Sequence, residues 1–279
     1  MKMIEFTKMH GLGNDYIYVD ADRFDIEDPA AFSLKWSKQH TGIGSDGLIL
    51  ISRSDRADFR MRIFNADGSE AMMCGNGSRC VGKFVHDKGL TDKTEITLET
   101  LAGVKVIRLQ LEDGRAVGAT VDMGTPALES REQVVSPDGT LNGMLLIGGG
   151  REYEGIFVSM GNPHCVIFVD NIEAVDVEKA GPELEFHPLF PERANIEFVQ
   201  KLPDGSLRMR VWERGSGVTR ACGTGACATA VAACVKGLAG RESRVLMDGG
   251  ALDICWDEGD GHVYMTGPAE TSFEGQLNI

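Results

Sequence analysis

The feature that most constrains this chain is an internal repeat with an offset of 148 residues. Residues 60–77 and 208–225 share six identities without a gap, where unrelated segments of that length would share about one. Both copies end in Cys-Gly-x-Gly, once from Cys74 to Gly77 and once from Cys222 to Gly225. Such self-similarity over a long period predicts that the chain is built from two domains of similar fold.

The repeat also indicates where the domains end. Asp122–Pro126 near the end of the first copy resembles Tyr264–Pro268 near the end of the second. A connector with Pro137-Asp138-Gly139 and three successive glycines, 148–150, separates the copies, and such residues favour turns.

We therefore expect an N-terminal repeat domain over residues 1–126. The C-terminal repeat domain, with the connector, is expected over residues 127–270. Residues 271–279 alternate weakly between apolar and polar side chains, which is typical of a strand, and this strand would complete the N-terminal domain.

Short β-rich runs dominate both copies and predict strands. These runs are residues 17–19, 48–51, 59–64, 104–111, 117–121, 166–169 and 196–199. A helix is predicted from Pro29 to Gln39 after Asp28 as its N-cap, and one more helix after each Cys-Gly-x-Gly turn, ending near Gly89 and Gly237. The predicted class is α+β: two pseudo-symmetric domains, each a mostly antiparallel sheet around a long helix, with the active site in the cleft between them.

Composition excludes several classes of function. The net charge is −14. A surface this acidic argues against a nucleic-acid partner and against a membrane surface. No run of about 18 apolar residues is present, and the N-terminus lacks the pattern of a signal peptide. The seven cysteines are an odd number without C-x-x-C spacing, so we expect reduced thiols in the cytoplasm and no metal site.

The two Cys-Gly-x-Gly turns suggest the chemistry. A helix N-terminus offers unpaired N–H groups and a positive partial charge, which favour a thiolate at Cys74 and Cys222 and a carboxylate beside the glycines. Two opposed thiols can remove a proton from one face of a carbon and deliver one to the other, as racemisation or epimerisation requires. No cofactor motif is evident, so no cofactor is expected.

The chain resembles the diaminopimelate epimerases over nearly its whole length. The resemblance rests on seven ordered segments: Lys8–Tyr16, Gly42–Gly47, Arg62–Gly68, Met73–Arg79, Gly161–His164, Arg193–Phe198 and Val211–Gly225. It implies a homodimeric, cofactor-independent isomerase that converts LL- to meso-2,6-diaminopimelate in lysine and peptidoglycan precursor biosynthesis.

The resemblance also implies residue roles. The implied catalytic residues are Cys74 and Cys222, the acid/base pair, assisted by His164 and Glu213. The implied substrate-binding residues are Asn14, Asn65, Gly75, Asn76, Asn162, Asn195, Glu213, Arg214, Gly223 and Thr224. A guanidinium such as that of Arg214 suits the distal carboxylate of the substrate. Gly47 departs from the family pattern, because some members carry Gln there, and so the side-chain contact of that Gln is absent.

Three alternatives remain open. The nearest is a proline or hydroxyproline racemase, although that family has His after its first Cys-Gly where this chain has Asn76. A phenazine-biosynthesis type isomerase lacks the cysteine pair. A non-catalytic amino-acid-binding protein on the same fold would bind its ligand without turning it over.

Overall fold

The computed structural model describes residues 2–142 and 144–278. By their contacts these residues form two compact units: unit 1 runs up to Asp122 and resumes at Thr266, and unit 2 is Met123–Met265. The ends expected from the repeat, residues 126 and 270, lie four and five residues beyond the contact-based ends at Asp122 and Met265. In the described part of the chain, no helix has the length and apolar character needed to span a membrane.

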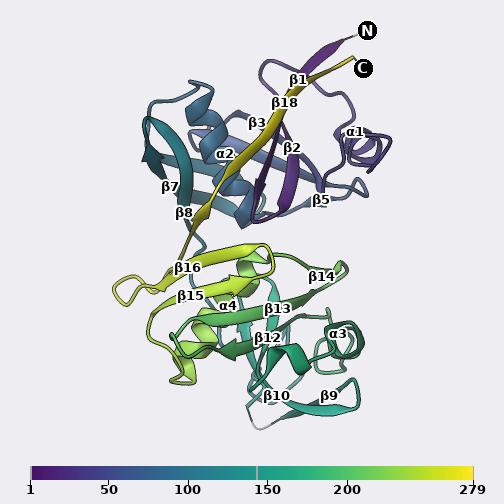
Figure 1. Ribbon diagram of the computed structural model, residues 1–279, viewed down its shortest axis with the longest axis vertical. Helices are drawn as coiled ribbons and strands as arrows, with labels where there is room; N and C mark the ends of the chain where they lie inside the picture. Colours follow the sequence, from purple (N-terminus) through teal and green to yellow (C-terminus); the bar gives the residue numbers. More distant parts are fainter. Residues whose placement is uncertain (1, 143, 279) are drawn as a thin grey trace. The chain divides into compact units, whose positions relative to one another are not determined.

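Unit 1 is rich in strands and contains two helices. In chain order its elements are β1 (Met3–Gly11), β2 (Asn14–Asp20), α1 (Pro29–Trp36), β3 (Gly47–Arg53), β4 (Phe59–Asn65), β5 (Glu70–Ala71), α2 (Gly75–Asp87), β6 (Glu95–Thr100), β7 (Gly103–Glu112), β8 (Arg115–Asp122) and β18 (Glu270–Asn278). The last strand, β18, pairs antiparallel with β1, so the two ends of the chain lie side by side in Figure 1.

Helix α2 is the centre of unit 1. It packs against β1, β2, β7 and β8, and ten of its residues are buried. Arg79 on this helix is fully buried, and it donates hydrogen bonds to Asn76 Oδ1 and to the carbonyl oxygen of Pro268. A second, apolar cluster around Ile17, Leu48 and Phe64 fills the space between β2, β3, β4 and α1. The sheet therefore surrounds α2 and holds its first turn in place.

Unit 2 repeats this plan. Its elements are β9 (Leu145–Gly148), β10 (Arg151–Ser159), β11 (Pro163–Phe168), η1 (Ile172–Ala174), α3 (Val177–Glu185), β12 (Asn195–Lys201), β13 (Leu207–Glu213), β14 (Gly217–Thr219), α4 (Gly223–Val235), β15 (Glu242–Met247), β16 (Gly250–Trp256) and β17 (Val263–Pro268), which crosses into unit 1. Helix α4 packs against strands β10–β13, β15 and β16, and it is apolar on all sides, as expected of an enclosed helix.

Strand register reproduces the 148-residue repeat. The parallel pair Tyr16–Gly47 of β2 and β3 corresponds to His164–Asn195 of β11 and β12. The antiparallel pairs follow at the same offset: Ile63 of β4 pairs with Ala71 of β5 in unit 1, and Val211 of β13 pairs with Thr219 of β14 in unit 2. The prediction of an α+β chain with two domains of similar, mostly antiparallel fold is confirmed.

The helices differ from the sequence-based expectation in two places. Helix α1 ends at Trp36 and not at Gln39, because the chain turns back there and the N–H of Ile43 donates to the carbonyl oxygen of Trp36. Helix α3 was not expected, because Pro182 lies inside it and proline disfavours a helix interior. Its first residue, Val177, nevertheless corresponds to Pro29 of α1 through the repeat.

The N-cap of α1 gives a test of the local fold. The Asp28 carboxylate accepts a hydrogen bond from the N–H of Ala31 at 2.9 Å. Asp28→Ala should lower the free energy of unfolding by about 1 kcal/mol, while Asp28→Asn should cost only a few tenths. Urea unfolding followed by circular dichroism measures both, and an equal loss in the two variants would contradict the role of the cap.

Candidate functional site

Each cysteine of the repeated turn is the N-cap of the central helix of its unit. Cys74 and Cys222 have extended backbones, and each sulfur accepts a hydrogen bond from the N–H three residues later, at 3.3 Å from Gly77 and at 3.4 Å from Gly225. The first N–H groups of α2 and α4 have no partner within the helix. Both helices therefore present a thiol next to N–H groups that can receive an anion.

The last glycine of each turn allows a strand side chain to approach the cap. A Cβ at Gly77 would lie 2.8 Å from Ile49 Cδ1, and a Cβ at Gly225 would lie 2.8 Å from Glu197 Oε1 and 3.2 Å from Cys222 Sγ. A Cβ at either position would displace the tip of that side chain, so glycine lets Ile49 and Glu197 lie directly against the turns. The same position of the fold thus holds an apolar side chain in unit 1 and a carboxylate in unit 2.

Amide and phenol side chains lie next to Cys74, and we call Asn14, Tyr16, Cys74 and Asn76 the first cysteine cluster. The thiol of Cys74 donates to Asn14 Oδ1 at 3.2 Å, and the amide of Asn76 approaches the same oxygen at 3.5 Å. Asp46 orients Asn14 by accepting from its Nδ2 at 2.8 Å. Burial and then Cys74 raise the pKa of Tyr16 well above its ordinary value, so its phenol stays protonated.

Two more positions of unit 1 belong to the sequence-based site. Asn65 ends β4, and its side chain donates a hydrogen bond to Ser69 Oγ at 3.0 Å. Gly47 pairs with Asn65 across the sheet, and a Cβ at Gly47 would meet the carbonyl oxygen of Phe64 at 2.1 Å. A larger residue at 47 therefore requires a different backbone here, which gives the departure at this position a structural basis.

Cys222 lies near an imidazole and two carboxylates as well as uncharged polar side chains, and we call Asn162, His164, Glu197, Glu213, Cys222 and Thr224 the second cysteine cluster. Cys222 Sγ lies 3.6 Å from Thr224 Oγ1, and Asn162 Nδ2 donates to that hydroxyl at 3.4 Å. Asn162 Oδ1 lies 3.2 Å from His164 Nε2. His164 Nδ1 lies 2.7 Å from Glu197 Oε1, and both side chains are fully buried.

Two carboxylates act on the thiol of Cys222. Burial, followed by the charges of Glu213 and Glu197, raises the pKa of Cys222 well above its ordinary value. Burial also raises the pKa of Glu213, which is opposed by hydrogen bonds that Glu213 accepts from Thr219 and Cys222. The thiolate expected from the helix N-terminus alone is therefore not favoured at Cys222, because burial and nearby negative charge outweigh the helix.

Asn195 and Arg214 are neighbours at one end of unit 2. Asn195 is buried, its Nδ2 donates to the carbonyl oxygen of Pro163 at 2.9 Å, and its Oδ1 accepts from the N–H of Arg214 at 3.0 Å. The guanidinium of Arg214 contacts the carbonyl oxygen of Glu192 at 3.1 Å. After these bonds, the side chain of Asn195 still has one N–H donor and one acceptor lone pair for a further partner. The guanidinium of Arg214 likewise keeps most of its N–H donors.

Sequence reasoning overlooked Glu197, Tyr16 and Asp46. The signal for Glu197 was present, because it is a carboxylate inside the apolar run that forms β12, and buried carboxylates are rare without a partner. Tyr16 and Asp46 carried no comparable signal. Their positions matter only through contacts with Cys74 and Asn14, which follow from the folded sheet.

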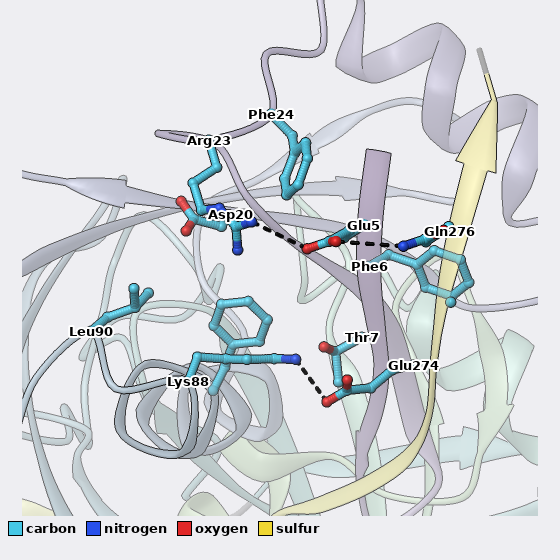
Figure 2. Close-up of a pocket in the computed structure, with 12 residues that line it drawn as sticks. Glu5, Phe6, Thr7, Asp20, Arg23, Phe24, Lys88, Leu90, Glu274 and Gln276 are labelled. Carbon is cyan, nitrogen blue, oxygen red and sulfur yellow. Dashed lines mark hydrogen bonds and ion pairs between the residues drawn. The ribbon is translucent and has the colours of Figure 1, made fainter. Parts of the chain in front are cut away.

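A cavity of about 450 Å³ in unit 1 lies apart from these clusters. Figure 2 shows two ion pairs among its charged side chains, Lys88 with Glu274 at 2.7 Å and Arg23 with Glu5 at 3.4 Å. None of the residues of the sequence-based site lines it. Within residues 2–142 and 144–278, no three His, Cys, Asp or Glu side chains are grouped so that they would hold a metal ion.

Comparison with known sequences points to one family. A family profile described as "Diaminopimelate epimerase" matches residues 6–129 and 156–272. A protein of that name from Phocaeicola vulgatus is 61% identical over 276 residues, 99% of each chain. Another from Bacteroides thetaiotaomicron is 56% identical over 274 residues, 98% of each chain, and one from Methanococcus maripaludis is 52% identical over 277 residues, 99% of this chain and all of that one.

Solved structures share the fold at much lower identity. A phenazine biosynthesis protein from Bacillus anthracis is 20% identical, with a TM-score of 0.72 over all of both chains. A hydroxyproline epimerase from Agrobacterium vitis is 19% identical, with a TM-score of 0.71 over 99% of this chain and 92% of that one. At these identities the likeness concerns the fold alone.

The second cysteine cluster predicts a measurable titration. Since the charge of Glu213 raises the pKa of Cys222, Glu213→Gln should move the ionisation of this thiol to lower pH. Carbon NMR of protein labelled at cysteine Cβ follows the titration, with Cys222→Ser for assignment. Glu154→Gln, which removes an exposed carboxylate of the same unit, is the control. An unchanged titration of Cys222 in Glu213→Gln would contradict the electrostatic account.

Proposed function

Because this chain belongs to the diaminopimelate epimerase family, we propose that it converts LL-2,6-diaminopimelate to meso-diaminopimelate by inverting one α-carbon without a cofactor. The observation that supports this most is the repeat-related pair of N-cap cysteines, Cys74 and Cys222, in a chain that is 61% identical to a protein of that name. The proposed reaction belongs to the biosynthesis of lysine and of peptidoglycan precursors.

The proposed mechanism uses one cysteine from each unit on a single α-carbon. The thiolate of one cysteine takes the α-proton, so the C–H bond breaks and an S–H bond forms. The thiol of the other delivers its proton to the opposite face, so a new C–H bond forms and that sulfur becomes the thiolate. Atoms and charge balance, and the two cysteines have exchanged protonation states, which suits a reversible reaction.

Negative charge develops on the substrate when the α-proton leaves. The reacting carboxylate would lie against the N–H groups at the start of α2 and α4, supplied by Gly75 and Asn76 and by Gly223 and Thr224. These groups are fixed before the reaction, so they stabilise the developing charge without rearrangement. The positive end of each helix acts in the same direction.

The remaining polar residues would hold the rest of the substrate. We assign substrate contacts to Asn14, Asn65, Asn162 and Asn195, to Glu213 for an ammonium group and to Arg214 for the distal carboxylate. His164 and Glu213 would assist proton transfer at Cys222, which is supported by the hydrogen bonds of the second cysteine cluster. Asn195 would use the donor and acceptor sites that its backbone contacts leave.

The alternatives are less well supported. The hydroxyproline epimerase and the phenazine biosynthesis protein share the fold at 19 and 20% identity, whereas the relatives named diaminopimelate epimerase reach 61%. A non-catalytic binding protein would have no use for two thiols at helix N-termini.

Cellular setting and assembly are part of the same proposal. All seven cysteines, which lie within the described residues, are free thiols. A catalytic thiol pair needs a reducing compartment, so we place the enzyme in the cytoplasm. The homodimer rests on the family resemblance.

The first prediction concerns the cysteines. Cys74→Ala and Cys222→Ala should each abolish epimerisation of LL-diaminopimelate, measured by chromatographic separation of the isomers, because each removes one of the two proton-transfer groups. Cys234→Ala, at the end of α4 and outside both cysteine clusters, is the matched control and should keep full activity. Full activity in either of the first two variants would overturn the two-cysteine mechanism.

A second prediction concerns Arg214. Arg214→Lys keeps the charge but loses the planar fork that fits a carboxylate, so kcat/KM should fall by about 10- to 100-fold, mainly through KM. Arg220→Lys, an exposed position six residues later, should change neither constant. If Arg214→Lys alters kcat alone, Arg214 does not bind the distal carboxylate in the ground state.

A further inference from the structure

Glu197 is an ionisable residue in a fully buried position, where a charged side chain is unusual. It and His164 have no exposed surface, and their side chains lie 2.7 Å apart. The second carboxylate oxygen, Oε2, is buried and has no hydrogen-bond partner among the described residues. Burying a carboxylate with one oxygen unpaired costs stability, so the fold itself gains nothing evident from a charge here.

The other unit shows that the fold accepts an apolar residue at this place. Ile49 occupies the corresponding position, with the corresponding antiparallel partner, Ile63 for Ile49 and Val211 for Glu197. Ile49 approaches the turn before α2 through Gly77, just as Glu197 approaches the turn before α4 through Gly225. A side chain is needed there for packing, but a carboxylate is present only beside Cys222.

Hydrogen bonds connect Glu197 to the thiol. They run from Glu197 to His164, from His164 to Asn162, from Asn162 to Thr224 and from Thr224 to Cys222. Both ring nitrogens of His164 face polar side chains, and because an ionised carboxylate can only accept, the Nδ1 that faces Glu197 Oε1 carries an N–H. Glu197 therefore fixes the orientation of the imidazole ring and favours the tautomer with a proton on Nδ1.

We propose that Glu197 is a positioning residue that holds the Nδ1–H of His164 and, through its buried charge, keeps Cys222 as the thiol, so that Cys222 is the proton donor of the resting enzyme. This inference rests on the proposed function and deepens it. The ionisable groups that face Glu197 are His164 and Cys165 on β11, Glu213 on β13 and Cys222 at the start of α4. Among them, Glu213 adds a second negative charge beside Cys222.

The contrast between the two clusters supports different resting states. Cys74 lies among Asn14, Tyr16 and Asn76 with an isoleucine beneath the cap, whereas Cys222 lies beside two carboxylates. A two-base reaction that starts from one isomer needs one thiolate and one thiol. Glu197 supplies a structural reason why the thiol is Cys222.

The first test uses the wild-type protein without substrate. Nitrogen NMR of histidine-labelled protein, with His164→Gln for assignment among six histidines, should show a proton on Nδ1 of His164 at pH 7. Cysteine Cβ labelling should show Cys222 as a thiol at the same pH. An unprotonated Nδ1 or a Cys222 thiolate would overturn the proposal, whatever the variants do.

The second test separates charge from packing. Glu197→Gln should lower kcat by about 10- to 100-fold, the scale for losing a group that orients a catalytic histidine, with KM within about threefold. It should also move the titration of Cys222 and the pH profile of kcat to lower pH. Glu197→Asp keeps the charge, so its pH profile should stay in place even though kcat falls.

The control for packing is Ile49→Val, which disturbs the same place in unit 1 and should leave the pH profile unmoved. If Glu197→Gln shifts neither the profile nor the Cys222 titration, Glu197 is structural and the proposal is wrong. If Glu197→Gln fails to fold, Glu197→Asp and the wild-type spectra still test the proposal. A shifted pH profile of kcat in Glu197→Asp, which keeps the negative charge, would contradict a role of that charge. Absence of wild-type epimerase activity would refute the proposed function, while the substrate-free spectra would still judge Glu197.

Discussion

The rest of the site depends on one hydrogen bond that occurs in both units. In it, a cysteine sulfur accepts from an N–H group in the first turn of a buried helix and so caps that helix. Cys74 and Cys222 each accept an N–H hydrogen bond there, and each leaves the earlier N–H groups of the turn unpaired within the helix. Strands pack around α2 and α4, and glycine at 77 and 225 lets a side chain of a neighbouring strand lie against each turn. One local motif therefore produces a thiol and an anion site together, once in each unit.

Duplication of this motif has been followed by chemical divergence. The register of the sheets is the same at an offset of 148 residues, yet the side chains around the caps differ in kind. The first cysteine cluster is built from amides and a phenol that stays protonated. The second contains an imidazole and two carboxylates, and burial together with the charges of the two carboxylates raises the pKa of Cys222. A similar backbone with different electrostatics is consistent with the proposed reaction, in which one cysteine accepts a proton and the other donates one.

The domain organisation and the two cysteine turns could be predicted from the sequence, because the internal repeat aligns them. The offset that aligns the Cys-Gly-x-Gly turns also predicts paired domains, N-cap cysteines and the helices that follow, and the structure has all of them. Helix α3 was missed because Pro182 lies inside it and proline has a low helix propensity, although α1, at the corresponding place in the repeat, was predicted. Glu197 was missed because its role depends on a partner, His164, that lies on a neighbouring strand. Contacts across strands are set by register, which single-residue patterns do not encode.

The central claim is that two cysteines act on opposite faces of one α-carbon, and the distribution of deuterium tests it most directly. The wild-type enzyme would be given LL-diaminopimelate in deuterated water, and both isomers would be isolated at low conversion. The account predicts meso product with one deuterium at the inverted carbon and recovered LL substrate with almost none, because the donor thiol carries solvent deuterium and the acceptor returns the original proton. Equal labelling of both isomers, or product that retains the original proton, would contradict it.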